Sequence, residues 1–143
     1  MPGVASLNAH QYYAHPRNAF WPIMADIYGF DVKLPYESRI DKLVMSGVAV
    51  WDVLSECIRP GSLDSDIKTG SRVANDFATF FNKHPKISKI GFNGLEAHKS
   101  FNKYVLPDIN SDEMSLIQLP STSPAHTLRL DEKIRIWRDK LRA

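Results

Sequence analysis

Short apolar segments that alternate with helical patterns constrain the fold of this 143-residue chain more than any other feature. The continuous run GVAVWDVL at 47–54 is typical of a strand buried on both faces. Two shorter runs of the same kind follow at 87–93 and 114–119. Strands that alternate with helices predict a single α/β domain over residues 1–143, in which a short, mostly parallel sheet lies between two helical layers in a three-layer α/β/α arrangement.

Apolar residues at helical spacing predict where the helices lie. The predicted helices cover 17–28, 36–46, 73–85, 94–105 and a terminal segment that ends at about Arg142. Asn18 precedes the apolar face of the first of these helices and is a candidate N-cap. We expect a loop over residues 1–16, and a long loop with one helical turn over 55–71.

Composition excludes several classes of protein. The net charge of +2 is too small to indicate nucleic-acid binding by itself, although residues 126–143 carry an excess of Lys and Arg. The apolar runs are shorter than the ~18–20 residues of a membrane-spanning helix, and no secretory signal is recognisable. Cys57 is the only cysteine, so an internal disulfide is impossible, and no Cys/His cluster indicates zinc. The cysteine usage therefore predicts a cytoplasmic protein. We also expect a monomer without a metal or cofactor.

Three segments resemble motifs of the uracil-DNA glycosylase superfamily: MPGVAS (1–6), AHPRNAFW (14–21) and LPSTSPA (119–125). The hypoxanthine (deoxyinosine) DNA glycosylase branch is similar in more segments, including YYAHPRNAFW (12–21), GSLDS (61–65), NDF (75–77) and FNG (92–94). The resemblance extends from Met1 to the last helix. It implies a uracil-DNA glycosylase-like fold.

The same resemblance implies a function. Such enzymes are monofunctional DNA-repair glycosylases, which flip a deaminated base out of DNA and hydrolyse its N-glycosidic bond without a metal. Here hypoxanthine is the expected base and uracil the next. In the family, MPGVAS resembles a loop that leaves the first strand, so we expect that strand to be missing from this chain. The alternatives are that Met1 is the true start of a three-stranded protein, or that the chain is an inactive, truncated relative that binds DNA or a protein partner.

Departures from the family pattern select the candidate catalytic residue. Met1 stands where most members have an Asp or Asn that acts on water, and Ser121 stands where many have His or Asn. The hypoxanthine branch is similar in lacking both groups, and its Asn in the HPRN segment corresponds to Asn18. The resemblance therefore implies that Asn18 orients the water, while helix capping remains the alternative reading.

Other residues are candidates for binding the base or the DNA backbone. Phe20 is the expected stacking ring, with a plain core position as the alternative. Tyr12 and Tyr13 are expected to line the pocket wall or to bind phosphate through their hydroxyls. Ser121 is expected in the pocket, where its small side chain leaves room for a purine. Asp52 either reads the base edge or caps a loop. The expected contacts to DNA phosphates are Ser6, Arg17, Ser123 and His126, with Arg129 and Lys133 as secondary contacts.

Overall fold

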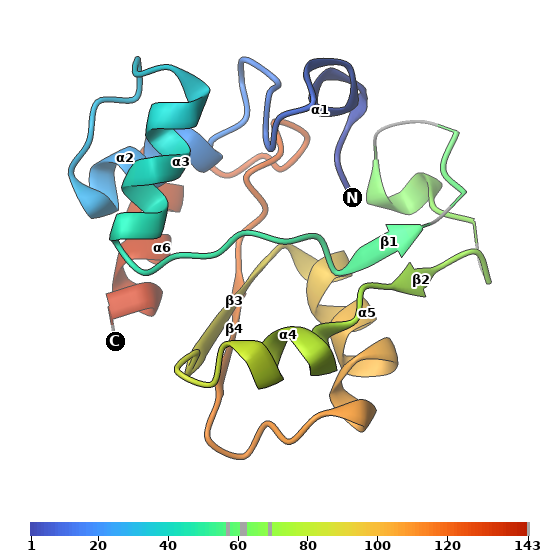
Figure 1. The fold of residues 1–143 in the computed structure, drawn as a ribbon. Coiled ribbons are helices and arrows are strands. Elements are labelled where there is room, and N and C mark those ends of the chain that lie inside the picture. Colours follow the sequence, from blue (N-terminus) through green and yellow to red (C-terminus); the bar gives the residue numbers. More distant parts are fainter. Residues whose placement is uncertain (57, 61–62, 69, 143) are drawn as a thin grey trace. The chain divides into compact units, whose positions relative to one another are not determined.

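The computed structural model describes residues 1–56, 58–60, 63–68 and 70–142, and its elements fall into two compact units (Figure 1). The sheet unit is Met1 with Asp52–Ser121, and the helical unit is Pro2–Trp51 with the segment from Thr122 onward. The sheet unit contains β1 (Leu54–Glu56), η1 (Asp64–Asp66), β2 (Val73–Ala74), α4 (Phe77–Lys83), β3 (Lys89–Asn93), α5 (Leu95–Tyr104), η2 (Leu106–Asp108) and β4 (Ser115–Leu119). The helical unit contains α1 (Val4–Ala9), α2 (Phe20–Tyr28), α3 (Tyr36–Met45) and α6 (Leu130–Arg142).

A parallel strand pair organises the sheet unit. β3 and β4 pair in register from Lys89 opposite Ser115 to Asn93 opposite Leu119, which confirms both predicted strands and their parallel direction. α5 follows β3 directly, and its Phe101 packs against Phe92 of β3 with ring centroids 4.9 Å apart. A buried core cluster of this unit consists of Phe77, Phe92, Phe101 and Val105.

The strand predicted over 47–54 is wrong in its position. The strand in this region is β1, which begins at Leu54 and pairs antiparallel with β2. Leu54 is buried, but Trp51 is 41% exposed. Asn75 holds the two residues before β1 in place. Its backbone N–H donates to the Val53 oxygen at 2.8 Å, and its side-chain amide donates to the Asp52 oxygen at 2.7 Å. The fold is mixed α/β with two small sheets, each of two strands among the described residues.

Two other boundaries differ from the predictions. The expected loop over 1–16 contains helix α1, which begins at Val4 after the N-cap Gly3 and ends before His10, where the backbone adopts a left-handed φ of 53°. Its Val4 and Leu7 are both more than half exposed, so the sequence there carries no buried periodic face to reveal the helix. The helix predicted over 73–85 begins only at Phe77, because Val73–Ala74 forms β2 and the Asp76 side chain caps the helix by accepting the Thr79 N–H.

The strongly periodic helices are confirmed. The segments predicted over 17–28, 36–46, 94–105 and at the terminus form α2, α3, α5 and α6. α6 docks on α2 through an ion pair between Arg138 and Asp26 and a hydrogen bond of 2.8 Å from Arg142 to the Ile27 oxygen. The expected helical turn in the long loop is η1, whereas Cys57, Gly61 and Ser62 lie outside the described residues. No helix in the described ranges is long and apolar enough to cross a membrane.

Candidate active site

An aromatic cluster at the start of α2 gathers several predicted site residues in the helical unit. The ring of Tyr13 stacks on Phe20, with centroids 4.0 Å apart and an angle of 26° between the planes. Trp21 and Trp137 both meet Phe20 edge-on, at 5.1 and 6.4 Å. Phe20 is therefore only 4% exposed, while Tyr13 is half-buried. Tyr12 adjoins the cluster with its ring 6.3 Å from that of Tyr13.

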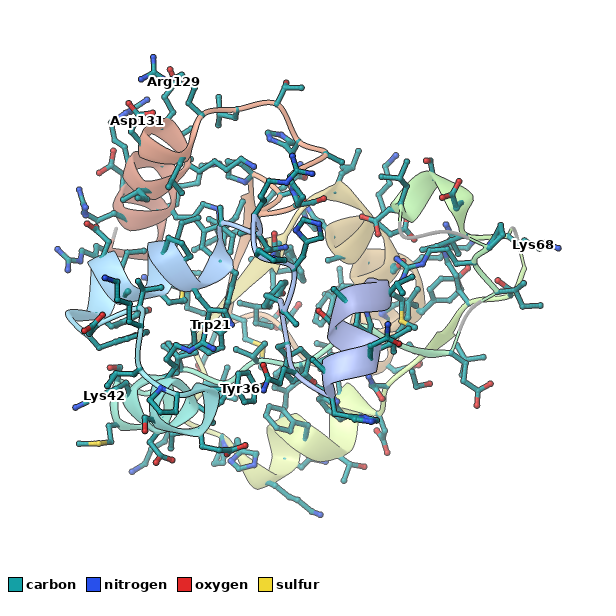
Figure 2. All side chains as sticks on the ribbon, turned by 90° about the horizontal axis from the view of Figure 1, so that it is seen from above. Trp21, Tyr36, Lys42, Lys68, Arg129 and Asp131 are labelled. Carbon is teal, nitrogen blue, oxygen red and sulfur yellow. The ribbon has the colours of Figure 1, made fainter. Side chains whose placement is uncertain are left out.

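The backbone around Tyr13 is held on both sides by side chains. The Tyr12 N–H donates to the Tyr36 hydroxyl and the Tyr12 oxygen accepts from the Trp21 indole, both at 3.1 Å. Trp21 and Tyr36 lie side by side, with centroids 5.8 Å apart at 85° (Figure 2). These bonds support the left-handed φ of 56° at Tyr13, which a residue other than glycine adopts only when its surroundings impose it.

Ser6 contributes to the same support. This residue is 7% exposed in α1, and its hydroxyl accepts the Ala14 N–H at 2.9 Å. The sequence predicted a phosphate contact for Ser6; the structure gives it a hydrogen bond that fixes the peptide after Tyr13. The three side chains of Ser6, Trp21 and Tyr36 thus anchor the segment that carries the Tyr13 ring.

Asn18 lies between this segment and α2. The N-cap of α2 is Ala19, so the N-cap predicted at Asn18 is wrong by one residue. The Asn18 side-chain oxygen accepts the Phe20 N–H at 2.9 Å, and this bond helps to order the helix start. An amide oxygen has two lone pairs, and one remains for another donor. The Asn18 N–H donates to the His15 oxygen at 2.9 Å, and the Arg17 N–H donates to the His15 ring at 3.1 Å, so His15 shapes the turn. Arg17 itself is exposed.

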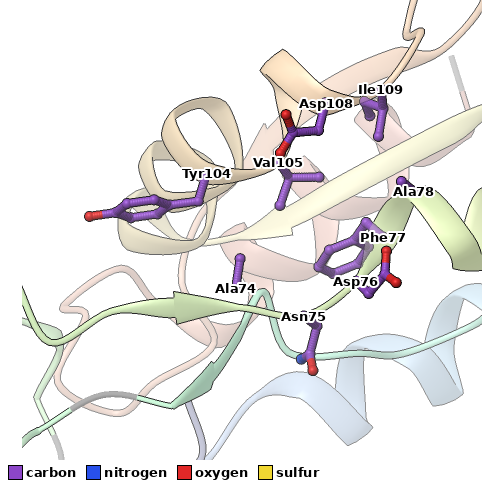
Figure 3. Close-up of a pocket in the computed structure, with 9 residues that line it drawn as sticks. All are labelled: Ala74, Asn75, Asp76, Phe77, Ala78, Tyr104, Val105, Asp108 and Ile109. Carbon is purple, nitrogen blue, oxygen red and sulfur yellow. The ribbon is translucent and has the colours of Figure 1, made fainter.

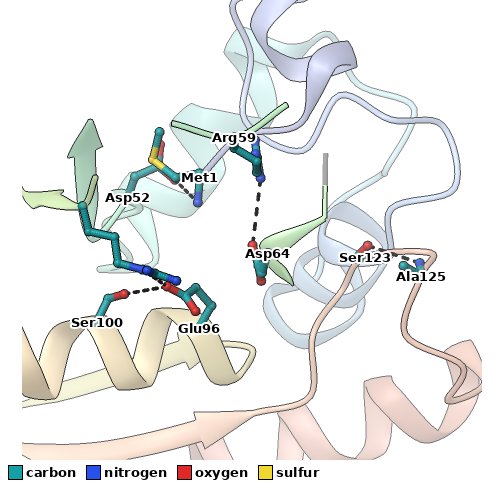
Figure 4. Close-up of polar contacts among 9 residues, drawn as sticks. Met1, Asp52, Arg59, Asp64, Glu96, Ser100, Ser123 and Ala125 are labelled. Carbon is teal, nitrogen blue, oxygen red and sulfur yellow. Dashed lines mark hydrogen bonds and ion pairs between the residues drawn. The ribbon is translucent and has the colours of Figure 1, made fainter. Parts of the chain in front are cut away.

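The segment 120–126 after β4 is here called the Ser-Pro loop, and from Thr122 onward it belongs to the helical unit. Thr122 is 1% exposed, and its oxygen accepts the Ala19 N–H at 2.9 Å. The Ser123 hydroxyl accepts the Ala125 N–H at 3.2 Å (Figure 4). His126 is exposed. Lys133 of α6, a predicted secondary contact to DNA phosphates, is only 3% exposed and lies beneath this loop.

Asp52 and Ser121 belong to the sheet unit. The Asp52 carboxylate lies 3.9 Å from the Met1 amino group (Figure 4). Burial raises the pKa of Asp52, and the Met1 amino group and Arg59 partly offset this rise. Ser121 lies at the ends of β3 and β4, against Gly94, where a Cβ on the glycine would come 3.2 Å from the Ser121 Cβ.

A pocket of about 290 Å³ in the sheet unit contains none of the predicted site residues (Figure 3). It is lined by Ala74, Asn75, Asp76, Phe77, Ala78, Tyr104, Val105, Asp108 and Ile109. Its Asp76 is occupied with the cap of α4, since it accepts from both the N–H and the hydroxyl of Thr79. Within the described ranges, no three His, Cys, Asp or Glu side chains are grouped to hold a metal ion.

Sequence reasoning missed the residues that support the aromatic cluster from other helices. Tyr36 lies in α3 and Trp137 in α6, and neither is near the YYAHPRNAFW segment in the sequence. One feature of the sequence could have indicated part of this support. Lys133 and Trp137 are four residues apart, which places them on one face of a helix. Both are buried, so this face of α6 carries an ammonium under the Ser-Pro loop and an indole against Phe20.

The known proteins that this chain is similar to carry the names of DNA glycosylases. No family model matches the chain. The hypoxanthine DNA glycosylase of Methanosarcina barkeri is 34% identical over 98 residues, and the protein of that name from Methanosarcina acetivorans is 34% identical over the same length. Each match covers 68% of this chain and 61% of the relative, so the chain spans less than two thirds of these curated relatives. The solution NMR structure of a candidate uracil DNA glycosylase from Methanosarcina acetivorans matches with a TM-score of 0.76 at 28% identity, covering 96% of this chain and 84% of that one.

Proposed function

This chain is homologous to the hypoxanthine DNA glycosylases of the uracil-DNA glycosylase superfamily, and from that premise we propose that it excises a deaminated base from DNA. Hypoxanthine is the proposed base, with uracil as the second. The observation that carries the proposal in this chain is the Tyr13–Phe20 stack beside Asn18 at the start of α2. The proposal extends to the three-layer fold of a monomer that works in the cytoplasm without a cofactor.

The aromatic cluster supplies a surface for the flipped base. Phe20 is enclosed by Tyr13, Trp21 and Trp137, so a base that enters meets Tyr13 before it meets Phe20. A base stacked on an aromatic ring gains about 1–3 kcal/mol, which offsets part of the cost of leaving the duplex. In this proposal Tyr13 is the stacking ring, Phe20 supports it from behind, and Tyr12 adjoins them. Asp52 and Ser121 remain candidates for binding the base because of the resemblance alone.

Asn18 is the proposed water-orienting residue. When the glycosidic bond breaks, its electron pair leaves with the base and the sugar becomes an oxocarbenium-like cation. A water oxygen then bonds to C1′ of the sugar, and the departing base takes up the proton that the water loses. The Asn18 amide accepts a hydrogen bond from that water but is too weak a base to remove the proton, so the leaving base supplies most of the driving force.

The DNA backbone is assigned to polar and cationic groups of the helical unit. Arg17 and His126 are exposed, and the Ser123 side chain lies in the Ser-Pro loop. Hydroxyl and cationic groups of this kind bind phosphates without reading sequence. Ser6 remains a proposed phosphate contact, and its hydroxyl also holds the Ala14 peptide by accepting the Ala14 N–H.

An oligonucleotide assay tests the function. The chain is incubated with duplexes that contain one deoxyinosine, one deoxyuridine or no damaged base, and abasic sites are revealed by alkaline cleavage. We expect cleavage at inosine, less at uracil and none in the undamaged duplex. Binding of the inosine duplex without any excision would reject the glycosylase and support a binding module.

A further inference from the structure

Lys133 is a buried cation that has no acidic partner in the part of the chain that the structure describes. Its side chain is 3% exposed, and across the described ranges no carboxylate lies within ion-pair distance of its ammonium group. Burial lowers the pKa of Lys133. A buried charge is costly unless hydrogen bonds or an opposite charge compensate it, so its position between α6 and the Ser-Pro loop needs an explanation.

The ammonium group holds the loop by its carbonyls. It donates to the Ser123 oxygen at 3.2 Å and to the His126 oxygen at 3.1 Å. The His126 N–H also donates to the Ser123 oxygen at 3.0 Å, and the Ala19 N–H donates to the Thr122 oxygen at 2.9 Å. Lys133 therefore closes the 123–126 segment into a ring against α6.

This arrangement changes the charge that the loop presents to solvent. The oxygens of Thr122, Ser123 and His126 carry partial negative charge, which would repel a phosphate, and all three are occupied by donors from the protein. Behind them lies a full positive charge, in an environment where salt screens it less than it would screen a surface lysine. The exposed side of the loop carries the His126 ring.

We propose that Lys133 positions the Ser123–His126 loop for a DNA phosphate and provides the positive charge that this phosphate pairs with across the loop. The inference rests on the proposed function in one respect only, namely that the ligand is DNA. Lys133 touches neither the base nor the sugar, so it is a positioning residue whose contribution is to binding rather than to bond cleavage.

The test measures how DNA binding depends on salt. An undamaged duplex with a fluorescent label is titrated with the parent chain and with K133M, K133Q and K133R between low and moderate salt. Each phosphate that a protein neutralises on duplex DNA contributes about 0.9 to the slope of log K against log salt. We expect K133M and K133Q to lose about 0.9 of the slope and several-fold in affinity at low salt, and K133R to retain the slope.

Two variants, K133Q and K42M, serve as controls for this test. K133Q keeps a donor for the loop carbonyls without a charge, so it decides the matter if K133M fails to fold. K42M removes the same charge from the exposed surface of α3, and we expect it to keep the parent slope. Folded K133Q with the parent slope would overturn the inference, because a purely structural lysine changes stability without changing the number of neutralised phosphates.

The use of undamaged DNA separates this inference from the proposed excision. If the parent releases no base but its salt slope falls in K133Q, the inference stands and the glycosylase proposal fails. If the parent excises hypoxanthine and the K133Q slope is unchanged, the glycosylase proposal stands and this inference fails. A parent chain that binds no duplex overturns both.

Discussion

At the scale of single residues, Asn18 combines a structural bond with a proposed chemical role, and one substitution can separate them. Its oxygen accepts the Phe20 N–H, a bond of the capping kind worth about 1 kcal/mol. Serine offers a hydroxyl for the same N–H but has no amide to orient water. We therefore expect N18S to keep nearly the parent stability and to lose excision by about a hundredfold or more.

The matched variant is N18A, which loses both the helix bond and the amide. We expect N18A to be destabilised by about 1 kcal/mol in urea unfolding and to be as inactive as N18S in single-turnover excision. Parent-like excision by N18S would show that Asn18 serves only the helix.

Tyr13 allows a second prediction, about base binding. If a flipped base stacks on this ring, Y13A should weaken binding of an inosine duplex by roughly ten- to a hundredfold, as expected for one lost stacking contact. Y13F keeps the ring and should bind nearly as the parent does. Competition with undamaged duplex measures the difference, and equal binding by Y13A and the parent would remove Tyr13 from the base site.

At the scale of elements, the junction of β3 and α5 depends on Gly94. This residue has a φ of +94°, and an added Cβ would lie 3.2 Å from the Ser121 Cβ. Its N–H also donates to the Leu119 oxygen at the end of β4, at 3.0 Å. We expect G94A to destabilise the chain by about 1–3 kcal/mol in urea unfolding, because the alanine strains the backbone and crowds the strand ends.

Gly70 is the control for this prediction. Its φ is +81°, but nothing lies within 4 Å of the place that a Cβ would occupy. G70A therefore carries the backbone strain without the crowding, and we expect it to be less destabilised than G94A. An equal loss in both variants would show that contact with Ser121 is unimportant.

The elements also show what the sequence reveals and what it conceals. Periodic helices such as α3 and α5 are predictable from the sequence, because each buries one apolar face against its own unit. The strand predicted over 47–54 was wrong in its position. An apolar sequence indicates that a segment tends to be extended, but it does not indicate whether a partner strand lies beside it. In α1 the exposed Val4 and Leu7 left no pattern at all.

The candidate site was predictable only where its residues are neighbours in the chain. Tyr13 and Phe20 lie within one segment, and the structure does bring them together. Tyr36 and Lys133 support that segment and the Ser-Pro loop from separate helices, and such pairings are decided by packing that no local pattern encodes.

At the scale of the whole molecule, acid stability provides a further test. Glu96 is half-buried, which by itself would raise its pKa, but hydrogen bonds from Arg72 at 2.6 Å and Ser100 at 2.9 Å outweigh the burial and lower it below the ordinary 4.5 (Figure 4). A lowered pKa contributes stability that is complete above pH 4.5 and is lost as the pH falls through the folded-state value.

E96Q should therefore be less stable than the parent at neutral pH, and the difference between the two should shrink as the pH falls below 4.5. Urea unfolding at a series of pH values measures this. Glu113 is exposed, so E113Q is the control and should follow the parent curve. A constant difference between E96Q and the parent at every pH would mean that the ionisation of Glu96 does not contribute.

The pairing of α2 with α6 has a consequence for how the protein is made. The ion pair between Asp26 and Arg138 joins residues 112 positions apart, whereas the sheet unit, apart from Met1, comes from the continuous stretch Asp52–Ser121. During synthesis the apolar face of α2 leaves the ribosome long before its partner helix exists. The stretch that forms the sheet unit can meanwhile complete its own contacts. In the nascent chain, the aromatic residues of α2 are thus exposed to chaperones and to aggregation until α6 arrives.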